Sequence, residues 1–191
     1  MVRSYYICFL LLIVLFANKK VISQPFHYLD VGISQSSFNQ LSDIYSNRWE
    51  LSSVNSIQFR TPFYLGIAGL NVDLFSYKDN EDKTIKVNSL NTSVFFGLNI
   101  INQNNFKLSP GILIGIQTLE SSSSSFSSNT IESELFYAFT LEPQIMFKNF
   151  ILFSDFQYRK VFNYYRQNLF SIGVGLKFRL NVSNTIRGYI D

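Results

Sequence analysis

Hydrophobic and polar residues alternate along most of the chain after residue 24, with the period of two that predicts β-strands. The segment 170–180 shows this most clearly. One of its faces carries Phe170, Ile172, Val174, Leu176, Phe178 and Leu180, and the other carries Ser171, Gly173, Gly175, Lys177 and Arg179. The pattern predicts a strand with one wholly apolar face and one face of small or charged side chains.

Seven further segments show the same alternation, so we expect eight strands in all. Four of these segments are regular, namely 28–34, 90–100, 106–118 and 134–147. Pro110 and Pro143 lie within the last two. Because proline cannot donate a ladder hydrogen bond, these two residues mark weak points of the prediction.

The remaining three segments, 49–60, 63–77 and 150–159, are less regular. In the first, Val54 and Asn55 lie on the opposite faces from those that the alternation requires. In the second, the phase breaks around Gly69, where we expect a β-bulge that restores the outward face. In the third, Ile151 and Phe153 do not fit the pattern.

The polar spacers between these segments alternate in length. Short spacers lie near 61–62, 103–105 and 148–149, and long ones lie at 37–47, 78–84, 119–132 and 160–167. Transmembrane barrels have short turns on the periplasmic side and long loops outside. With the N-terminus in the periplasm, every long spacer lies outside. The sequence therefore predicts an all-β, eight-stranded, antiparallel up-and-down transmembrane β-barrel over residues 24–180.

A soluble eight-stranded barrel of the lipocalin type would show the same alternation with its faces reversed. The glycines favour the membrane barrel, because glycine weakens a strand and an exposed outer face gains nothing from it. The face that we expect to point inward holds Gly32, Gly97, Gly111, Gly115, Gly173 and Gly175. The opposite face is bulky in nearly every segment and would overfill a small interior. The soluble ligand-binding barrel remains the alternative.

Composition agrees with a membrane environment. Charged residues make up 15% of the chain, which also holds 20 Phe and 11 Tyr. Soluble domains carry about 25% charged residues. A membrane protein turns such apolar surface outward, towards lipid.

Residues 1–23 have the form of a signal peptide. Arg3 supplies a positive start, and an apolar run follows over 5–17. This run is shorter than the roughly 20 residues that a transmembrane helix needs. We expect cleavage after Ser23. The alternative is an uncleaved N-terminal anchor.

The leader also accounts for the positive net charge. Removing it takes Arg3, Lys19 and Lys20 from the 16 basic residues and nothing from the 13 acidic ones, so the mature chain is formally neutral. No basic patch then indicates a nucleic-acid partner. The single cysteine, Cys8, lies within the leader, so the mature chain has no thiol for a disulfide or a metal.

The segment 171–180, with the sequence SIGVGLKFRL, resembles the closing strand of the small OmpA-like and OmpX-like outer-membrane β-barrel proteins of Gram-negative bacteria. The resemblance covers the leader, the strand count and this strand. It implies a monomer that spans the outer membrane, has a polar, ion-paired interior and is inserted by the barrel-assembly machinery. That family ends at an aromatic residue of the last strand. Here residues 181–191 continue as an expected periplasmic tail, and Phe178 takes the place of the aromatic signal.

Charged residues on the inward faces lie near the periplasmic end of neighbouring strands. We expect an interior ion-pair network of Asp30, Glu142, Asp155, Lys177 and Arg179. Three further charges, Glu50, Glu134 and Arg159, are expected higher in the barrel. The network is interpreted as a structural plug, because an unpaired buried charge is very costly. The alternative is an ion-conducting path.

The sequence contains no pattern typical of a catalytic, cofactor or metal site. An enzyme site requires a base near a nucleophile, and the only histidine, His27, lies at the periplasmic start of the first segment. We therefore expect a non-catalytic protein with a role in envelope structure or in adhesion through its loops. A narrow pore and a lipid-modifying enzyme are the alternatives.

Aromatic residues near the expected strand ends predict interfacial belts, which anchor a barrel in outer-membrane lipid. The residues assigned to these belts are Trp49, Tyr64, Tyr137, Tyr158, Tyr164 and Tyr165.

Overall fold

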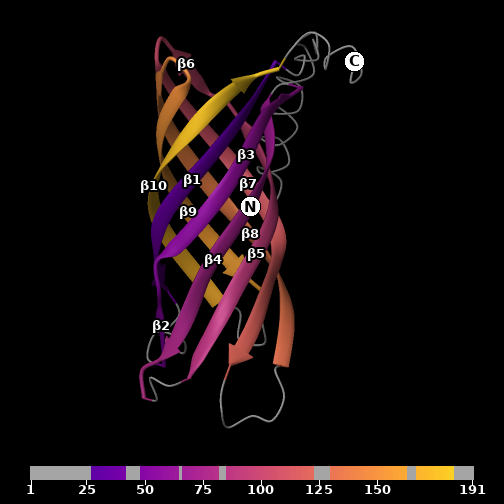
Figure 1. Ribbon diagram of the computed structural model, residues 1–191, viewed down its shortest axis with the longest axis vertical. Coiled ribbons are helices and arrows are strands. Elements are labelled where there is room, and N and C mark those ends of the chain that lie inside the picture. Colours follow the sequence, from indigo (N-terminus) through magenta and orange to yellow (C-terminus); the bar gives the residue numbers. More distant parts are fainter. Residues whose placement is uncertain are drawn as a thin grey trace, which may run out of the picture.

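The computed structural model describes residues 27–41, 48–64, 66–81, 85–122, 130–162 and 167–182, which form a closed antiparallel β-barrel (Figure 1). Its strands are β1 (Tyr28–Gln40), β2 (Trp49–Leu51), β3 (Val54–Phe63), β4 (Gly66–Asp79), β5 (Lys86–Leu98), β6 (Ile101–Gln103), β7 (Phe106–Ser122), β8 (Thr130–Phe147), β9 (Phe150–Val161) and β10 (Gln167–Asn181). Among the described residues there is no helix long and apolar enough to span a membrane.

Eight long strands make the wall, and each pairs with its neighbours along the chain. β10 pairs with β1 from Tyr28↔Asn181 to Gln40↔Leu169, which closes the barrel. The two short strands extend this wall: β2 pairs with β4 beyond the start of β3, and β6 pairs with the first residues of β7. The predicted eight-stranded, up-and-down fold is confirmed.

The strands are strongly tilted, as a small barrel requires. A circuit of paired residues that leaves β1 at Asp30 returns to the same strand at Gln40. The residues on this circuit are Asp30, Arg60, Gly69, Phe95, Leu113, Ala138, Arg159, Leu169 and Gln40. This displacement staggers neighbouring strands, so side chains from different strands interleave in the interior.

Short turns and long connections lie at opposite ends of the barrel. The upper end in Figure 1 holds the three short turns and the ends of β1 and β10, and is called the turn end. Each short turn places one residue at positive φ, namely Tyr64, Asn104 and Lys148. At the lower end, called the loop end, lie the strand ends that flank the connections 41–48, 80–85, 123–129 and 162–166. The predicted alternation of spacer length is confirmed.

Apolar side chains cover the outside of the barrel. Ile33, Val174 and Phe139 are 66%, 62% and 54% exposed, while the residues that precede them on their strands, Gly32, Gly173 and Ala138, are buried on the inside. A soluble ligand-binding barrel has the reverse arrangement, with apolar residues inside and polar residues outside. The surface is therefore one for hydrocarbon, in which only a closed barrel satisfies every backbone hydrogen bond.

The irregular segments have simple structural explanations. Val54 points inward and Asn55 outward, and Ile151 and Phe153 also point inward. The bulge predicted at Gly69 is wrong, because β4 pairs in unbroken register with both β3 and β5. Apolar side chains on the inner face, rather than a shift of register, disturb the alternation.

The two prolines interrupt pairing without ending their strands. Pairing of β8 with β9 stops at Leu141↔Phe156 and resumes at Gln144↔Phe153, so Pro143 lies in the gap. Pro110 lies just beyond Gly97↔Gly111, where β5 stops and β6 has not yet begun. Proline has no N–H group to donate to a ladder. Each of these prolines lies where pairing with one of its two neighbouring strands is interrupted.

The inward glycines make room for large interior side chains. The ring of Phe95 lies against Gly97 and Gly111, where the added Cβ of any other residue would overlap the ring. Phe153 lies against Gly175 in the same way. Glycine is therefore needed at these positions for close approach, which agrees with its predicted place on the inner face.

We expect Gly111→Val to destabilise the barrel by about 1–3 kcal/mol, because it forces Phe95 out of its position. Urea unfolding in lipid vesicles measures this change. Ile112→Val, at the adjacent lipid-facing position, is the control and should cost less than about 1.5 kcal/mol. Equal effects of the two substitutions would contradict this packing.

Candidate functional site

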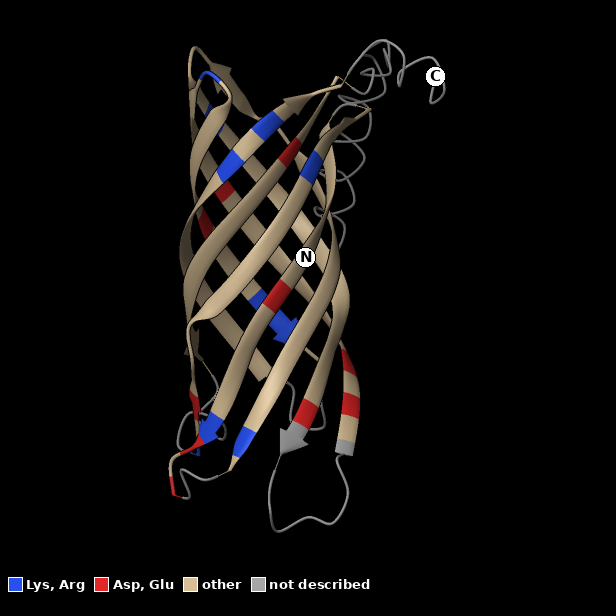
Figure 2. Ribbon diagram, viewed as in Figure 1, with Lys and Arg blue, Asp and Glu red and all other residues tan. Residues whose placement is uncertain are grey.

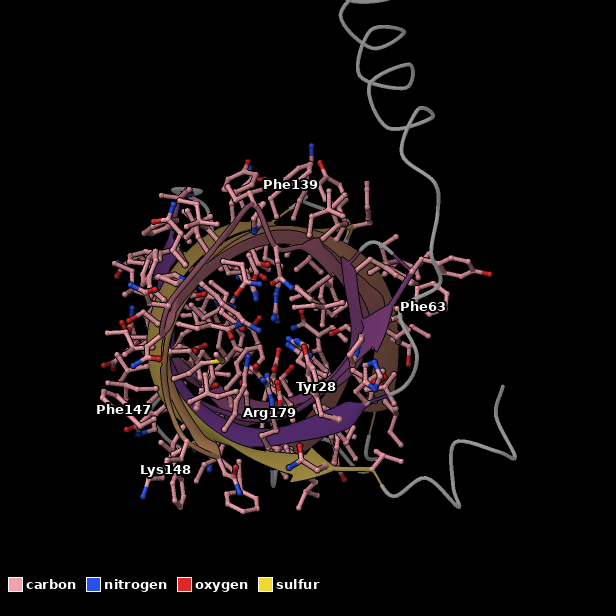
Figure 3. All side chains as sticks on the ribbon, turned by 90° about the horizontal axis from the view of Figure 1, so that it is seen from above. Tyr28, Phe63, Phe139, Phe147, Lys148 and Arg179 are labelled. Atoms are coloured by element: carbon pink, nitrogen blue, oxygen red, sulfur yellow. The ribbon has the colours of Figure 1, made fainter. Side chains whose placement is uncertain are left out.

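Side chains fill the interior of the barrel, as the view along its axis shows (Figure 3). Tyr28 and Arg179 point into the ring at the turn end, whereas Phe63, Phe139 and Phe147 point outward. Charged positions lie along the upper and middle parts of the strands, and a second group lies at the loop end (Figure 2).

The first layer is an ion pair between β10 and β1. Arg179 donates from Nε to Asp30 Oδ1 and from Nη2 to Asp30 Oδ2, both at 2.7 Å. Its guanidinium carbon lies 3.7 Å from the centre of the Tyr28 ring. Two parallel hydrogen bonds and a stacked ring fix the arginine in one orientation.

The second layer pairs Lys177 of β10 with Glu142 of β8. Lys177 Nζ donates to Glu142 Oε1, which also accepts a hydrogen bond from Gln144. The ammonium lies 4.1 Å from the centre of the Phe153 ring. Both charged side chains are almost fully buried. Such a pair is tolerated because each charge has a partner and further hydrogen bonds.

Arg60 of β3 lies in the interior without a carboxylate partner among the described residues. It donates to Asn71 Oδ1 and to the carbonyl oxygens of Phe59 and Leu70. Its guanidinium carbon lies 4.0 Å from the centre of the Phe95 ring. Carbonyl and amide oxygens together with the aromatic face replace the hydration that the cation loses.

The third layer joins strands on opposite sides of the barrel. Arg159 of β9 donates from Nη2 to Asp73 Oδ2 of β4 at 2.6 Å, and from Nε to Gln157 Oε1 at 2.9 Å. The rings of Phe136 and Phe38 lie 4.4 and 5.0 Å from its guanidinium carbon. The pair borders a cavity of about 10 Å³, which is room for one water molecule.

The structure brings together four of the five charges predicted to form the inner network. Asp30 pairs with Arg179 and Glu142 with Lys177. Asp155 is half-buried on the inner face of β9, and it forms no salt bridge within the described part of the chain.

The three charges expected higher in the barrel have different outcomes. Arg159 is buried and paired, and Glu134 is half-buried at the loop end of β8. Glu50 contradicts the prediction, because β2 turns it outward into solvent. Its neighbours Trp49 and Leu51 take the inner face and pack against the apolar residues there.

Sequence reasoning missed Asp73, the partner of Arg159, and it left Arg60 outside the network. Asp73 was missed because the phase of 63–77 was taken to break at Gly69. An unbroken phase would have placed Leu70, Val72 and Leu74 outward and Asp73 inward, as the structure has them. The signal was present in the sequence and was obscured by inward-pointing Ile67.

Beyond the third layer, towards the loop end, the interior holds a cluster of apolar side chains. Phe38, Phe75 and Tyr77 form a chain of ring contacts, and the Trp49 ring meets the Tyr77 ring edge-on at 6.4 Å. The cluster also contains Val54, Phe136, Val161 and Leu169, with Leu51, Val87 and Leu119 packed against it. Gln117 donates to the Tyr77 hydroxyl at 2.9 Å, which satisfies that buried oxygen. This apolar cluster lies inside the barrel towards the loop end, together with the buried polar residues Gln117, Gln167 and Asp79.

Towards the loop end, the outward residues of the barrel change from apolar to polar. On several strands, the outward residue next to an apolar inward residue is polar or charged. These outward residues, here called the collar, are Lys78, Lys86, Asn88, Glu120, Lys160 and Asn168. The wall is polar inside and apolar outside along most of its length. At the collar its outward residues become polar on several strands, and its inward residues are a mixture of apolar side chains and buried polar ones such as Asp79, Gln117 and Gln167. Outward polar side chains of this kind suit water rather than hydrocarbon.

Of the aromatic residues predicted to lie in interfacial belts, Tyr64 and Tyr158 lie on the outside near strand ends. Tyr137 also lies on the outside, but in the middle of β8. Trp49 contradicts the prediction, because it points into the apolar cluster. Tyr164 and Tyr165 lie outside the described residues, as do the predicted signal peptide 1–23 and most of the predicted tail 181–191. His27 is exposed at the turn end, next to β1.

Comparisons with solved structures identify the architecture. Neisserial surface protein A matches with a TM-score of 0.53 at 12% identity, over 82% of this chain and 97% of that one. The attachment invasion locus protein Ail of Yersinia pestis matches with a TM-score of 0.51 at 18% identity, over 82% and 99%. The outer membrane protein AlkL matches with a TM-score of 0.52 at 11% identity, over 86% and 95%. The fold is that of the small outer-membrane β-barrels. No family model and no curated protein matches the sequence.

Removing one partner of the innermost pair should cost far more than removing both. Asp73→Leu or Arg159→Met alone leaves a buried charge unpaired, and we expect a loss of about 3–5 kcal/mol. The double variant should lose clearly less than the sum of the two. Urea unfolding of the three variants in lipid vesicles measures this coupling, and additive losses would show that the two side chains do not interact.

The position of Trp49 gives a second prediction. Because this single tryptophan lies inside the barrel at the level of the collar, lipids with brominated acyl chains should quench its fluorescence only weakly. A control variant that combines Trp49→Phe with Val174→Trp places the indole on the lipid-facing surface and should be quenched strongly. Strong quenching of the wild-type protein would restore Trp49 to an interfacial belt.

Proposed function

We propose that this protein is a non-catalytic outer-membrane barrel that holds its loop-end connections above the outer surface of the cell. The polar outward residues of the collar carry this proposal, because they suit water rather than hydrocarbon. A wall that is polar on its outside at this level extends beyond the bilayer and lifts the four long connections clear of it.

The closed interior supports a structural role rather than transport. Three buried ion pairs and the apolar cluster occupy the axis from the turn end to the loop end. The apolar cluster opposes ion passage most strongly, since a bare ion would lose its hydration among aromatic rings.

The proposed orientation places the turn end in the periplasm and the loop end outside. It follows the arrangement of outer-membrane barrels, which have short periplasmic turns and long outer loops. Export by the signal peptide and insertion by the barrel-assembly machinery belong to the same proposal. Outer-membrane lipids are then the immediate partners of a monomer, and the long connections are free for adhesion or for structural contacts in the envelope. One protein of the same fold, Ail, is described as an attachment invasion locus protein.

Cysteine labelling tests the orientation in cells that express the full chain. With Cys8 replaced by serine the background holds no thiol, so single cysteines report cleanly. A membrane-impermeant maleimide should label Ser124→Cys, in the 123–129 connection, on intact cells. It should label Asn149→Cys, in the short turn between β8 and β9, only after lysis. The reverse pattern, or labelling of neither variant with the protein in the soluble fraction, would overturn the proposal.

Planar-bilayer recording tests the closed interior. The purified protein, shown to be folded by its different gel mobility before and after boiling, should give no steady conductance. A steady conductance that is abolished by a bulky substitution on the inner face would identify a narrow pore instead.

A further inference from the structure

A polar patch interrupts the lipid-facing surface on β1 and β3. Gln35 and Asn55 are cross-strand neighbours, and both are exposed on the outside of the barrel. Their outward neighbours in the same row are Val174 on β10 and Leu74 on β4, which are 62% and 51% exposed. Two side-chain amides therefore lie between two aliphatic side chains.

On β1 the outward residues are apolar up to Ile33 and polar from Gln35 to Asn39, so the patch lies at the edge of the apolar outer surface, on the turn-end side of the collar. Beyond Val174, towards the loop end, the outward positions of β10 remain apolar at Ile172. Ile172 is the cross-strand neighbour of exposed Ser37. On the other side, Leu74 is paired with Leu90 of β5, which is also exposed. The outward residues of β1 are therefore polar at a level where the outward residues of β10, β4 and β5 are still apolar.

Amides in hydrocarbon require hydrogen-bonding partners, because each unsatisfied polar group costs several kcal/mol there. Gln35 donates to Ser53 Oγ at 3.4 Å, which is a long hydrogen bond. The described residues offer no side-chain hydrogen bond to Asn55 or Ser37. A ligand in the membrane that carries donors and acceptors would satisfy these groups.

The surface beside the amides has a hollow that could bind an acyl chain. A hollow of about 610 Å³ in the outer surface has Gln35 and Asn55 at its edge towards the loop end. The rest of its lining is mainly aliphatic, with Ile33, Ile57, Leu152, Leu74, Val174 and Leu176. A molecule bound there would place an apolar chain towards the membrane centre and a polar group towards the outer surface, which is how an outer-leaflet lipid lies.

Charge restricts the polar group of that lipid. The outward residues of β1, β3 and β10 within the described ranges include no lysine, arginine, aspartate or glutamate. A phosphate would call for a cationic partner, which this sector does not supply. Neutral amides and hydroxyls match the hydroxyl groups of a sugar.

A second hollow, at the turn end, shows what an ordinary lipid contact looks like on this barrel. It measures about 650 Å³ and is lined by residues such as Phe63, Phe96, Leu98, Ile112 and Phe139, with no amide or charged side chain. Hydrocarbon alone fills such a surface. The amides therefore distinguish the first hollow from general lipid contact.

We propose that the hollow on β1 and β3 binds an outer-leaflet lipid with an uncharged, hydroxyl-bearing head group, whose hydroxyls hydrogen-bond with Gln35 and Asn55. A concave face favours a lipid over a second copy of the chain, since two hollows related by a two-fold axis would face each other and leave space unfilled. The proposal rests on the membrane placement proposed above.

Native mass spectrometry of the full mature protein tests the proposal. The protein is released from vesicles that contain equal amounts of monogalactosyl diacylglycerol, phosphatidylcholine and phosphatidylglycerol. The wild-type protein should retain about tenfold more galactolipid than either phospholipid, as expected for about two net hydrogen bonds. The double variant Gln35→Leu/Asn55→Leu should lose this preference to within about twofold. Asn88→Leu, the same chemical change at the collar, is the control and should keep the preference.

Several outcomes would overturn the proposal. These are retention of phosphatidylglycerol above the galactolipid, equal retention of all three lipids by the wild type, or a preference that survives the double substitution. A wild-type dimer in the spectrum that the double variant abolishes would assign the patch to a second copy instead. Gel mobility before and after boiling shows that each variant is folded. Because the lipid assay uses purified protein, its failure is distinguishable from a wrong orientation in cells, which cysteine labelling detects.

Discussion

The structure depends on one constraint, which is that backbone polar groups in hydrocarbon must find their hydrogen-bond partners within the protein. A sheet meets this condition only when its first and last strands pair, as β1 and β10 do from Tyr28 to Gln40. Closure then fixes two surfaces of opposite chemistry on every strand. The outside must suit lipid, and the inside must fill a narrow space without leaving charges unpaired.

The interior meets the second requirement with a repeated arrangement of a cation, an aromatic ring and an oxygen acceptor. Arg179, Lys177, Arg60 and Arg159 each lie over a ring, and three of them also pair with a carboxylate. Glycines on neighbouring strands leave the space that two of these rings occupy. The glycines, the rings and the ion pairs are therefore one packing solution, in which small residues on the wall permit large ones on the axis.

The polarity of the wall divides the barrel into two parts with different environments. On the turn-end side of the collar, charges and amides face inward and aliphatic side chains face outward. At the collar, Tyr77 and Leu169 face inward while Lys78 and Asn168 face outward. The amides on β1 and β3 are a local exception to this division, because they lie outward among lipid-facing neighbours. Such an exception is costly in hydrocarbon unless something binds it, which makes it the most informative part of the outer surface.

The sequence by itself determined the strand count, the direction of each regular face and the alternation of short turns with long connections. Period-two alternation is a local property, so 170–180 and 134–147 carry it in full. The tertiary structure decided which charges meet: Asp73 and Arg159 are 86 positions apart, and only the stagger of a closed barrel brings them together. It also decided the inward direction of Trp49 and the outward direction of Glu50. Which residues meet inside the barrel, and which outward residues lie at the same level, depends on the stagger of the strands, and that stagger is set only when all eight strands close.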